Sequence, residues 1–192
     1  MLANAVTLSR LLFLALCVYL LHLPSITARL AAFALIIFTI FIDAIDGMIA
    51  RRRGSVSALG AVLDIAIDRV VENVFWIAFV SLGLVPLWVA LVVVTRGILT
   101  DAVRGFAMGQ GLQPFDMMQT GWGRWLVSQR FMRAFYGVVK AVTFPALALL
   151  HALLLVWPGT TQAAYLPILR LVVDVLIYLT VGINLLRGIP VL

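Results

Sequence analysis

Four aspartates interrupt an otherwise apolar part of the chain, FIDAIDGMIARRRGSVSALGAVLDIAIDR, residues 41–69. They are Asp43, Asp46, Asp64 and Asp68. A carboxylate at the centre of a bilayer costs about 2.5–3.5 kcal/mol on insertion scales, so a group of four requires a hydrated cavity and nearby positive charge. Carboxylate oxygens without an accompanying His or Cys are the ligands that Mg²⁺, Mn²⁺ or Ca²⁺ prefer. A divalent-metal site is therefore one use of these residues.

Two other uses fit the same residues. The aspartates are close in sequence to Arg51, Arg52, Arg53 and Arg69, so structural ion pairs are possible. Intramembrane carboxylates also line proton and cation pathways. From spacing alone, a metal-dependent enzyme, a cation or proton transporter and structural ion pairing all remain open.

Helical periodicity brings the four carboxylates together. At 100° per residue, residues of two groups each share one face of a helix. The first group, on one helix, is Asp43, Asp46, Gly47 and Ala50. The second group recurs every four residues on the next helix and is Gly60, Asp64 and Asp68. Their small residues let a backbone or ligand approach closely. The turn RRRGSVS joins the two helices as an antiparallel hairpin, so we expect the acidic faces to meet near one membrane surface.

The composition identifies the elements that carry these faces as membrane helices. Of the 192 residues, 64% are hydrophobic and 11% are charged, and the mean hydropathy is +1.15. A soluble domain is about half apolar and a quarter charged. Runs of about 20 apolar residues, the length of a transmembrane helix, predict a single domain, residues 1–192, with six membrane-spanning helices in one all-α bundle. The predicted ranges are 7–23, 29–51, 57–82, 86–108, 131–156 and 165–186.

The distribution of basic residues predicts the orientation. Most loop arginines fall in two of the five connections, and the positive-inside rule places that side in the cytoplasm. These arginines are Arg51, Arg52, Arg53, Arg124, Arg130 and Arg133. Both termini and the metal site, at the ends of the second and third helices, are then cytoplasmic. The segment 108–125 is long enough for an ordered cytoplasmic excursion.

The aspartate pattern resembles the signature of the CDP-alcohol phosphotransferase family. The match covers every fixed position of Asp43-x-x-Asp46-Gly47-x-x-Ala50-Arg51, then eight residues, then Gly60-x-x-x-Asp64-x-x-x-Asp68. The opening NAVTLSR is similar to the N-terminal signature of the phospholipid synthases in this family, although Ala3 replaces a proline that is frequent there. The resemblance also implies six transmembrane helices.

The resemblance implies that an acceptor alcohol attacks CDP-diacylglycerol and displaces CMP. It implies two Mg²⁺ or Mn²⁺ ions held by the four aspartates, with Asp68 also acting as the catalytic base. The residues implied to border CDP are Asp43, Gly47, Ala50, Arg51, Gly60 and Asp64. It further implies a membrane phospholipid product and a homodimer, and no nucleic-acid partner is expected. A bacterial inner membrane, with the active site facing the cytoplasm, fits so compact a chain.

Basic residues on the fourth and fifth predicted helices indicate a pocket for an anionic acceptor. The five residues share helical faces, and an unpaired cation within an apolar run requires a partner or a bound anion. They are Arg96, Arg104, Arg130, Arg133 and Lys140. Glycerol 3-phosphate is the expected acceptor, with inositol phosphate or phosphatidylglycerol as alternatives. The lysine-rich segment of many phosphatidylglycerophosphate synthases is replaced here by SQRFMRAFYGVVK, and snorkelling to lipid headgroups also explains Arg130 and Arg133.

Two further acidic residues are predicted to form ion pairs. Glu72 continues the stripe of Asp64 and Asp68, and we expect it to pair with Arg69 or Arg96. Arg170 and Asp174 are four residues apart on the last predicted helix, and this spacing predicts an ion pair within that helix.

Overall fold

The structure is a computed structural model that describes residues 2–53, 58–109, 130–157 and 164–188. Side chains are described in these ranges except at residues 2–8, 43–53, 58–59, 61, 64, 108, 130 and 133. The described chain forms six α-helices, which confirms the predicted all-α class and helix number for these ranges. They are α1 (Leu2–His22), α2 (Ile26–Arg53), α3 (Ala58–Ser81), α4 (Leu87–Gly109), α6 (Arg130–Val156) and α7 (Leu166–Gly188).

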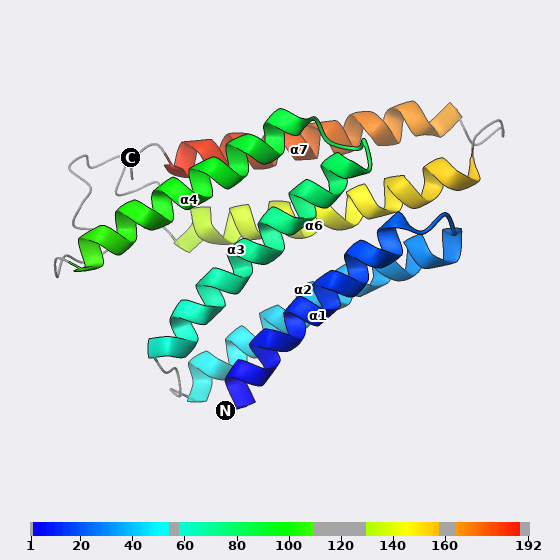
Figure 1. The fold of residues 1–192 in the computed structure, drawn as a ribbon. Coiled ribbons are helices and arrows are strands. Elements are labelled where there is room, and N and C mark those ends of the chain that lie inside the picture. Colours follow the sequence, from blue (N-terminus) through cyan, green and yellow to red (C-terminus); the bar gives the residue numbers. More distant parts are fainter. Residues whose placement is uncertain (1, 54–57, 110–129, 158–163, 189–192) are drawn as a thin grey trace.

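By their contacts, the six described helices form a closed ring in which each helix packs mainly on two neighbours. Around the ring the order is α1, α2, α6, α7, α4 and α3, and α3 returns to α1. The end of α2, the start of α3, the end of α4, the start of α6 and the end of α7 lie at the same end of the ring (Figure 1). This arrangement places the backbone of both aspartate stripes at the end that sequence analysis predicts to be cytoplasmic.

Aromatic side chains fill the centre of the ring. Phe144 of α6 lies 5.3 Å, between ring centroids, from both Phe75 and Trp76 of α3, and 6.2 Å from Phe79. Trp76 and Phe79 are fully buried. Aromatic pairs at these separations stabilise a core by more than their buried area alone. They hold α3, which carries the second aspartate stripe, against α6.

The outer surface of the ring is apolar. Many large hydrophobic side chains face outward, including Leu12 on α1, Phe106 on α4 and Leu171 on α7. By length and composition, two described segments can cross a membrane, Ala134–Val156 and Leu166–Gly188. The protein is thus a helical protein of the membrane type.

A glycine cap ends α3 on the side opposite the aspartates. The amide of Leu84 donates to the carbonyl of Phe79 at 3.0 Å, and the amide of Gly83 donates to Val80 at 3.0 Å. This pair of bonds is the Schellman arrangement, which needs a left-handed residue at its centre. Gly83 supplies it with φ of 71°. The cap allows the chain to reverse into α4 within a few residues.

Candidate active site

Most of the predicted metal ligands lie on described helices but outside the described side chains. Helix α2 is helical through residues 43–50 and α3 through residues 60–68, so the sequence positions keep their predicted helical faces. The predicted site residues whose side chains lie outside the described ones are Asp43, Asp46, Gly47, Ala50, Arg51, Asp64, Arg130 and Arg133. The segment 110–129, with most of the predicted cytoplasmic excursion, also lies outside them. The cage of four carboxylates stays a prediction.

Asp68 is the predicted ligand whose side chain the structure describes. The Arg10 guanidinium of α1 donates to its carboxylate, with 2.5 Å between Nη2 and Oδ1. The Arg10 side chain is 9% exposed, whereas that of Asp68 is 51% exposed. The carboxylate is therefore fixed on one side by a buried cation and open on the other. An open, oriented carboxylate oxygen can bind a metal ion or accept a proton.

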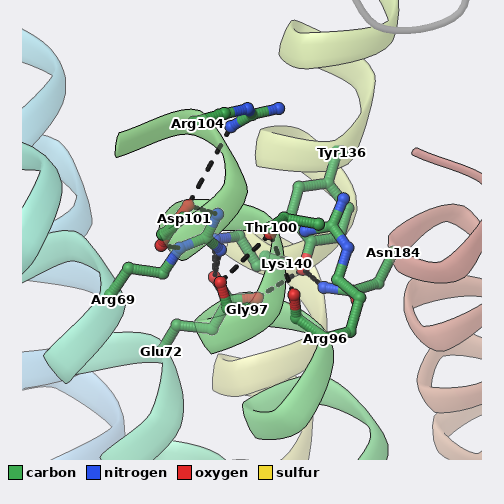
Figure 2. Close-up of polar contacts among 10 residues, drawn as sticks. All are labelled: Arg69, Glu72, Arg96, Gly97, Thr100, Asp101, Arg104, Tyr136, Lys140 and Asn184. Atoms are coloured by element: carbon green, nitrogen blue, oxygen red, sulfur yellow. Dashed lines mark hydrogen bonds and ion pairs between the residues drawn. The ribbon is translucent and has the colours of Figure 1, made fainter. Parts of the chain in front are cut away.

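A buried polar cluster lies one turn beyond Asp68, where α3 meets α6 and α7 (Figure 2). Its centre is Glu72, which is 3% exposed. The carboxylate accepts hydrogen bonds from the Tyr136 hydroxyl, from Lys140 Nζ at 2.9 Å and from Arg69 Nη1 at 3.4 Å. Asn184 Nδ2 in turn donates to the Tyr136 hydroxyl oxygen at 2.6 Å. The predicted Glu72–Arg69 pair is confirmed, and Lys140 is a second cationic partner.

A second carboxylate, Asp101, ties α4 to α3 in the same view (Figure 2). Arg69 donates to both of its oxygens, from Nε at 2.7 Å and from Nη2 at 3.2 Å. Arg104 approaches it more loosely, with 4.0 Å between Nη1 and Oδ1. Two-point arginine–carboxylate contacts are the stronger and more directional kind. Arg69 therefore links both carboxylates of the cluster.

Arg96 differs from the other predicted acceptor-pocket residues in this cluster. Lys140 and Arg104 each face a carboxylate, whereas Arg96 makes no ion pair with any residue that the structure describes. Its residue is 9% exposed, and its buried Nε has no hydrogen-bond partner within the described part of the chain. Its side chain packs on Gly188, where an added Cβ would lie 2.6 Å from Nε. Buried guanidinium groups ordinarily have partners, so this one is available to an anion.

The structure adds site residues that sequence analysis did not single out for a role here. They are Arg10, Asp101, Tyr136, Asn184 and Gly188. Polar residues inside apolar runs were the available signal for Arg10 and Asn184, because such residues face the interior of a helix bundle. Tyr136 precedes Lys140 by one helical turn, so the two share a face. The predicted Arg170–Asp174 pair is confirmed on α7, with 3.1 Å between Nε and Oδ1.

Comparison with known proteins identifies a family over nearly the whole chain. The family model described as CDP-alcohol phosphatidyltransferase matches residues 1–185. An archaetidylinositol phosphate synthase of Aeropyrum pernix is 29% identical over 93 residues, which cover 47% of each chain. A protein of Mycobacterium tuberculosis, provisionally named a cardiolipin synthase, is 34% identical over 88 residues, covering 46% of this chain and 42% of its own. The matched part thus spans less than half the length of these curated relatives.

Proposed function

Because the chain belongs to the CDP-alcohol phosphatidyltransferase family, we propose that it transfers the phosphatidyl group of CDP-diacylglycerol to an acceptor alcohol and releases CMP. The observation that carries this proposal is the complete aspartate motif, residues 43–68, within a family match over residues 1–185. The product would be a membrane phospholipid. The relatives' names place two different acceptors within the family, so the acceptor needs a separate argument.

The proposed cofactor is a pair of divalent ions, Mg²⁺ or Mn²⁺. The residues that would hold them are Asp43, Asp46, Asp64 and Asp68. This donor set fits hard cations because all of its ligand atoms are carboxylate oxygens. When bound, the ions would neutralise the diphosphate and the charge that develops on the departing phosphate. The Asp68 side chain is 51% exposed and, among the described residues, is paired with Arg10, which leaves room for such a ligand.

Asp68 is the proposed general base. The acceptor hydroxyl gives its proton to the Asp68 carboxylate while its oxygen bonds to the phosphorus that carries diacylglycerol. The bond from that phosphorus to the bridging oxygen breaks, and CMP leaves with the electron pair. Arg10 orients the carboxylate through its hydrogen bond and is a positioning residue. Small residues at 47, 50 and 60 would leave space for the nucleotide, and Arg51 would pair with its phosphates.

We further propose that the acceptor carries a phosphate group, with glycerol 3-phosphate as the first choice. Among the described side chains of the cluster, cations outnumber carboxylates by five to two. The cations are Arg69, Arg96, Arg104, Lys140 and Arg187, and the carboxylates are Glu72 and Asp101. A phosphate compensates much of this surplus, whereas serine or choline does not. Inositol phosphate and phosphatidylglycerol satisfy the same criterion.

The membrane arrangement follows from the same proposal. All six helices of one domain would cross the membrane, with the metal site at the cytoplasmic end of the ring. The host membrane would be a bacterial inner membrane, and the protein would act as a homodimer. Chemical cross-linking in native membranes tests the dimer.

An acceptor panel tests the reaction. Purified protein with Mg²⁺ or Mn²⁺ is given CDP-diacylglycerol with glycerol 3-phosphate, inositol phosphate, phosphatidylglycerol or serine, and both CMP and lipid mass are measured. We expect CMP release only when an acceptor is present. Asp68→Asn should lower turnover by about 10²–10⁴-fold, the usual effect of losing a general base, while the metal still binds. A cation transporter would instead retain ion binding and release no CMP with any acceptor.

A further inference from the structure

A chain of polar contacts joins α1 to α3 at the outer end of the bundle, opposite the aspartates (Figure 1). The imidazole of His22 contacts the Val18 carbonyl from Nδ1 at 2.8 Å and Ser81 Oγ from Nε2 at 3.0 Å. The Ser81 hydroxyl in turn donates to the Ala78 carbonyl at 2.7 Å. The chain therefore consists of three contacts, and each needs one hydrogen to be a hydrogen bond.

The protonation state of His22 decides how many of these contacts are hydrogen bonds. The Val18 carbonyl only accepts, so Nδ1 carries a hydrogen in this arrangement. In the neutral imidazole Nε2 is then bare, and the single hydroxyl hydrogen of Ser81 serves either Nε2 or the Ala78 carbonyl. In the protonated imidazole Nε2 donates to Ser81 Oγ, and the hydroxyl hydrogen is free for Ala78. Protonation thus adds one hydrogen bond to the chain.

The end of α1 favours a positive charge on His22. This residue is the basic one in the last turn of the helix. Carbonyl groups in a last turn lack helical partners and carry a partial negative charge, which stabilises a nearby cation. The helix end and the added hydrogen bond therefore act in the same direction.

The neighbouring helices bring one opposing charge, on Arg29 of α2. Its guanidinium donates to a carbonyl of the α1–α2 connection at 3.3 Å and to the His151 carbonyl of α6 at 3.0 Å. Charges on Arg29 and on His22 both act on His151, so the three side chains form one cluster. On α7, Arg170 is already paired with Asp174, and the final turns of α3 and first turns of α4 carry no charged residue. The contacts of His22 at about 3 Å thus outweigh one more distant cation.

We propose that His22 and Ser81 form a proton-dependent clasp between α1 and α3, which tightens as the pH on that side of the membrane falls. Histidine is the side chain that ordinarily changes charge between about pH 5 and 8. The added hydrogen bond belongs to the protonated form, so the clasp is complete at low pH and loses one bond as the pH rises.

The clasp is the second of two ties between these helices. The other is the contact of Arg10 with Asp68, which lies twelve residues away along α1 and thirteen along α3, or about 18–20 Å. The pair α1–α3 is therefore held at both ends, and one tie depends on pH. The clasp does not depend on the proposed transfer reaction, so either proposal can fail without the other.

Nuclear magnetic resonance of protein labelled with ¹⁵N at histidine tests the clasp directly, because it distinguishes protonated from neutral imidazole. The chain has two histidines, and His22→Gln identifies the signal of His22. We expect Ser81→Ala to lower the pH at which His22 is half protonated by about half a unit, or about threefold in proton affinity. This is less than for a buried charged hydrogen bond, because both side chains are exposed and water replaces part of the loss.

Ser25→Ala is the matched control for this titration. Ser25 lies at the same end of the bundle, but its hydroxyl contacts Thr27 Oγ1. It should leave the titration of His22 unchanged. Equal titration of the wild type and Ser81→Ala would overturn the proposal, and so would an equal change in Ser25→Ala.

A double-mutant cycle tests whether the added hydrogen bond stabilises the protein. The Tm is measured for the wild type, His22→Gln, Ser81→Ala and the double variant, at about pH 5.5 and about pH 8. Glutamine is polar but cannot be protonated. We expect the coupling between the two sites to be larger at the lower pH by about 1–3 °C, which corresponds to the threefold change in proton affinity. Coupling that is the same at both pH values, or larger at the higher one, would refute the proton dependence.

Discussion

Replacing Glu72 by glutamine should destabilise the helix ring by about 3–5 kcal/mol, the usual cost of removing one partner from a buried ion pair. The substitution conserves volume and keeps an acceptor for the Tyr136 hydroxyl. It removes the negative charge that faces Lys140 Nζ at 2.9 Å, in a position where the Glu72 side chain is 3% exposed. Arg69 retains Asp101 as a partner, so the loss falls mainly on Lys140.

Thermal unfolding in detergent micelles, followed by near-ultraviolet circular dichroism, measures this effect. For a chain of this size about 1 kcal/mol corresponds to about 2–4 °C, so the expected decrease in Tm is about 6–20 °C. Asp174→Asn is the matched control, because it also removes the carboxylate of an ion pair, here with Arg170, but the two side chains are 34–38% exposed. An exposed pair contributes about 0–1 kcal/mol.

A second substitution shows whether the decrease in Tm comes from the broken ion pair or from a packing defect. Lys140→Met in the Glu72→Gln background removes the uncompensated charge and should recover at least half of the lost Tm. The reasoning would be refuted if Glu72→Gln lowered the Tm no more than Asp174→Asn does. It would also be refuted if Lys140→Met made the double variant less stable than Glu72→Gln alone.

Three further predictions concern other parts of the ring. Arg10→Gln should lower kcat for CMP release by at least about tenfold while the KM for CDP-diacylglycerol changes little, because the proposed role of Arg10 is to orient the Asp68 carboxylate. Arg10→Lys should recover part of kcat, and an unchanged kcat would exclude a positioning role. Gly83→Ala should destabilise the protein by about 1–2 kcal/mol, measured as a lower Tm, because alanine is strained at φ of 71°. The control is Gly105→Ala within α4, where nothing lies within 4 Å of the added Cβ. This control substitution should be neutral or stabilising. Ser25→Cys places a thiol between α1 and α2, on the side proposed to face away from the cytoplasm. In cells with an intact inner membrane it should react with a membrane-impermeant maleimide, and the native Cys17 should add little background because it is buried. Labelling only after lysis would reverse the proposed orientation.

The helices were largely predictable because a bilayer imposes a length on each apolar run. All six predicted ranges fall on observed helices, but the limits differ at some helix ends. Helix α1 begins at Leu2 rather than at residue 7, and α2 runs from Ile26 to Arg53 rather than over 29–51. The apolar run reports the part that contacts hydrocarbon, whereas backbone hydrogen bonding continues into the interface. Helix limits therefore exceed the hydropathy limits in these two helices.

Contacts within one helix were predictable, and contacts across the ring were not. Glu72 with Arg69 and Arg170 with Asp174 follow from spacings of three and four residues. The pairing of Lys140 with Glu72, and of Arg10 with Asp68, depends on which helices are neighbours. Apolar periodicity shows that a helix has an inward face but does not say which helix that face meets. Sequence reasoning thus required a partner for Lys140 without identifying it.

The distribution of partners among the cations separates two roles within one basic cluster. Lys140 and Arg69 are held by carboxylates on the inside of the ring, where they join α3 to α6 and α4. Arg96 lies in the same cluster but packs on Gly188, with no described carboxylate in contact. The first two charges are already compensated, so an acceptor phosphate gains less from them than their number suggests. The electrostatic attraction for an anionic acceptor is therefore concentrated at Arg96.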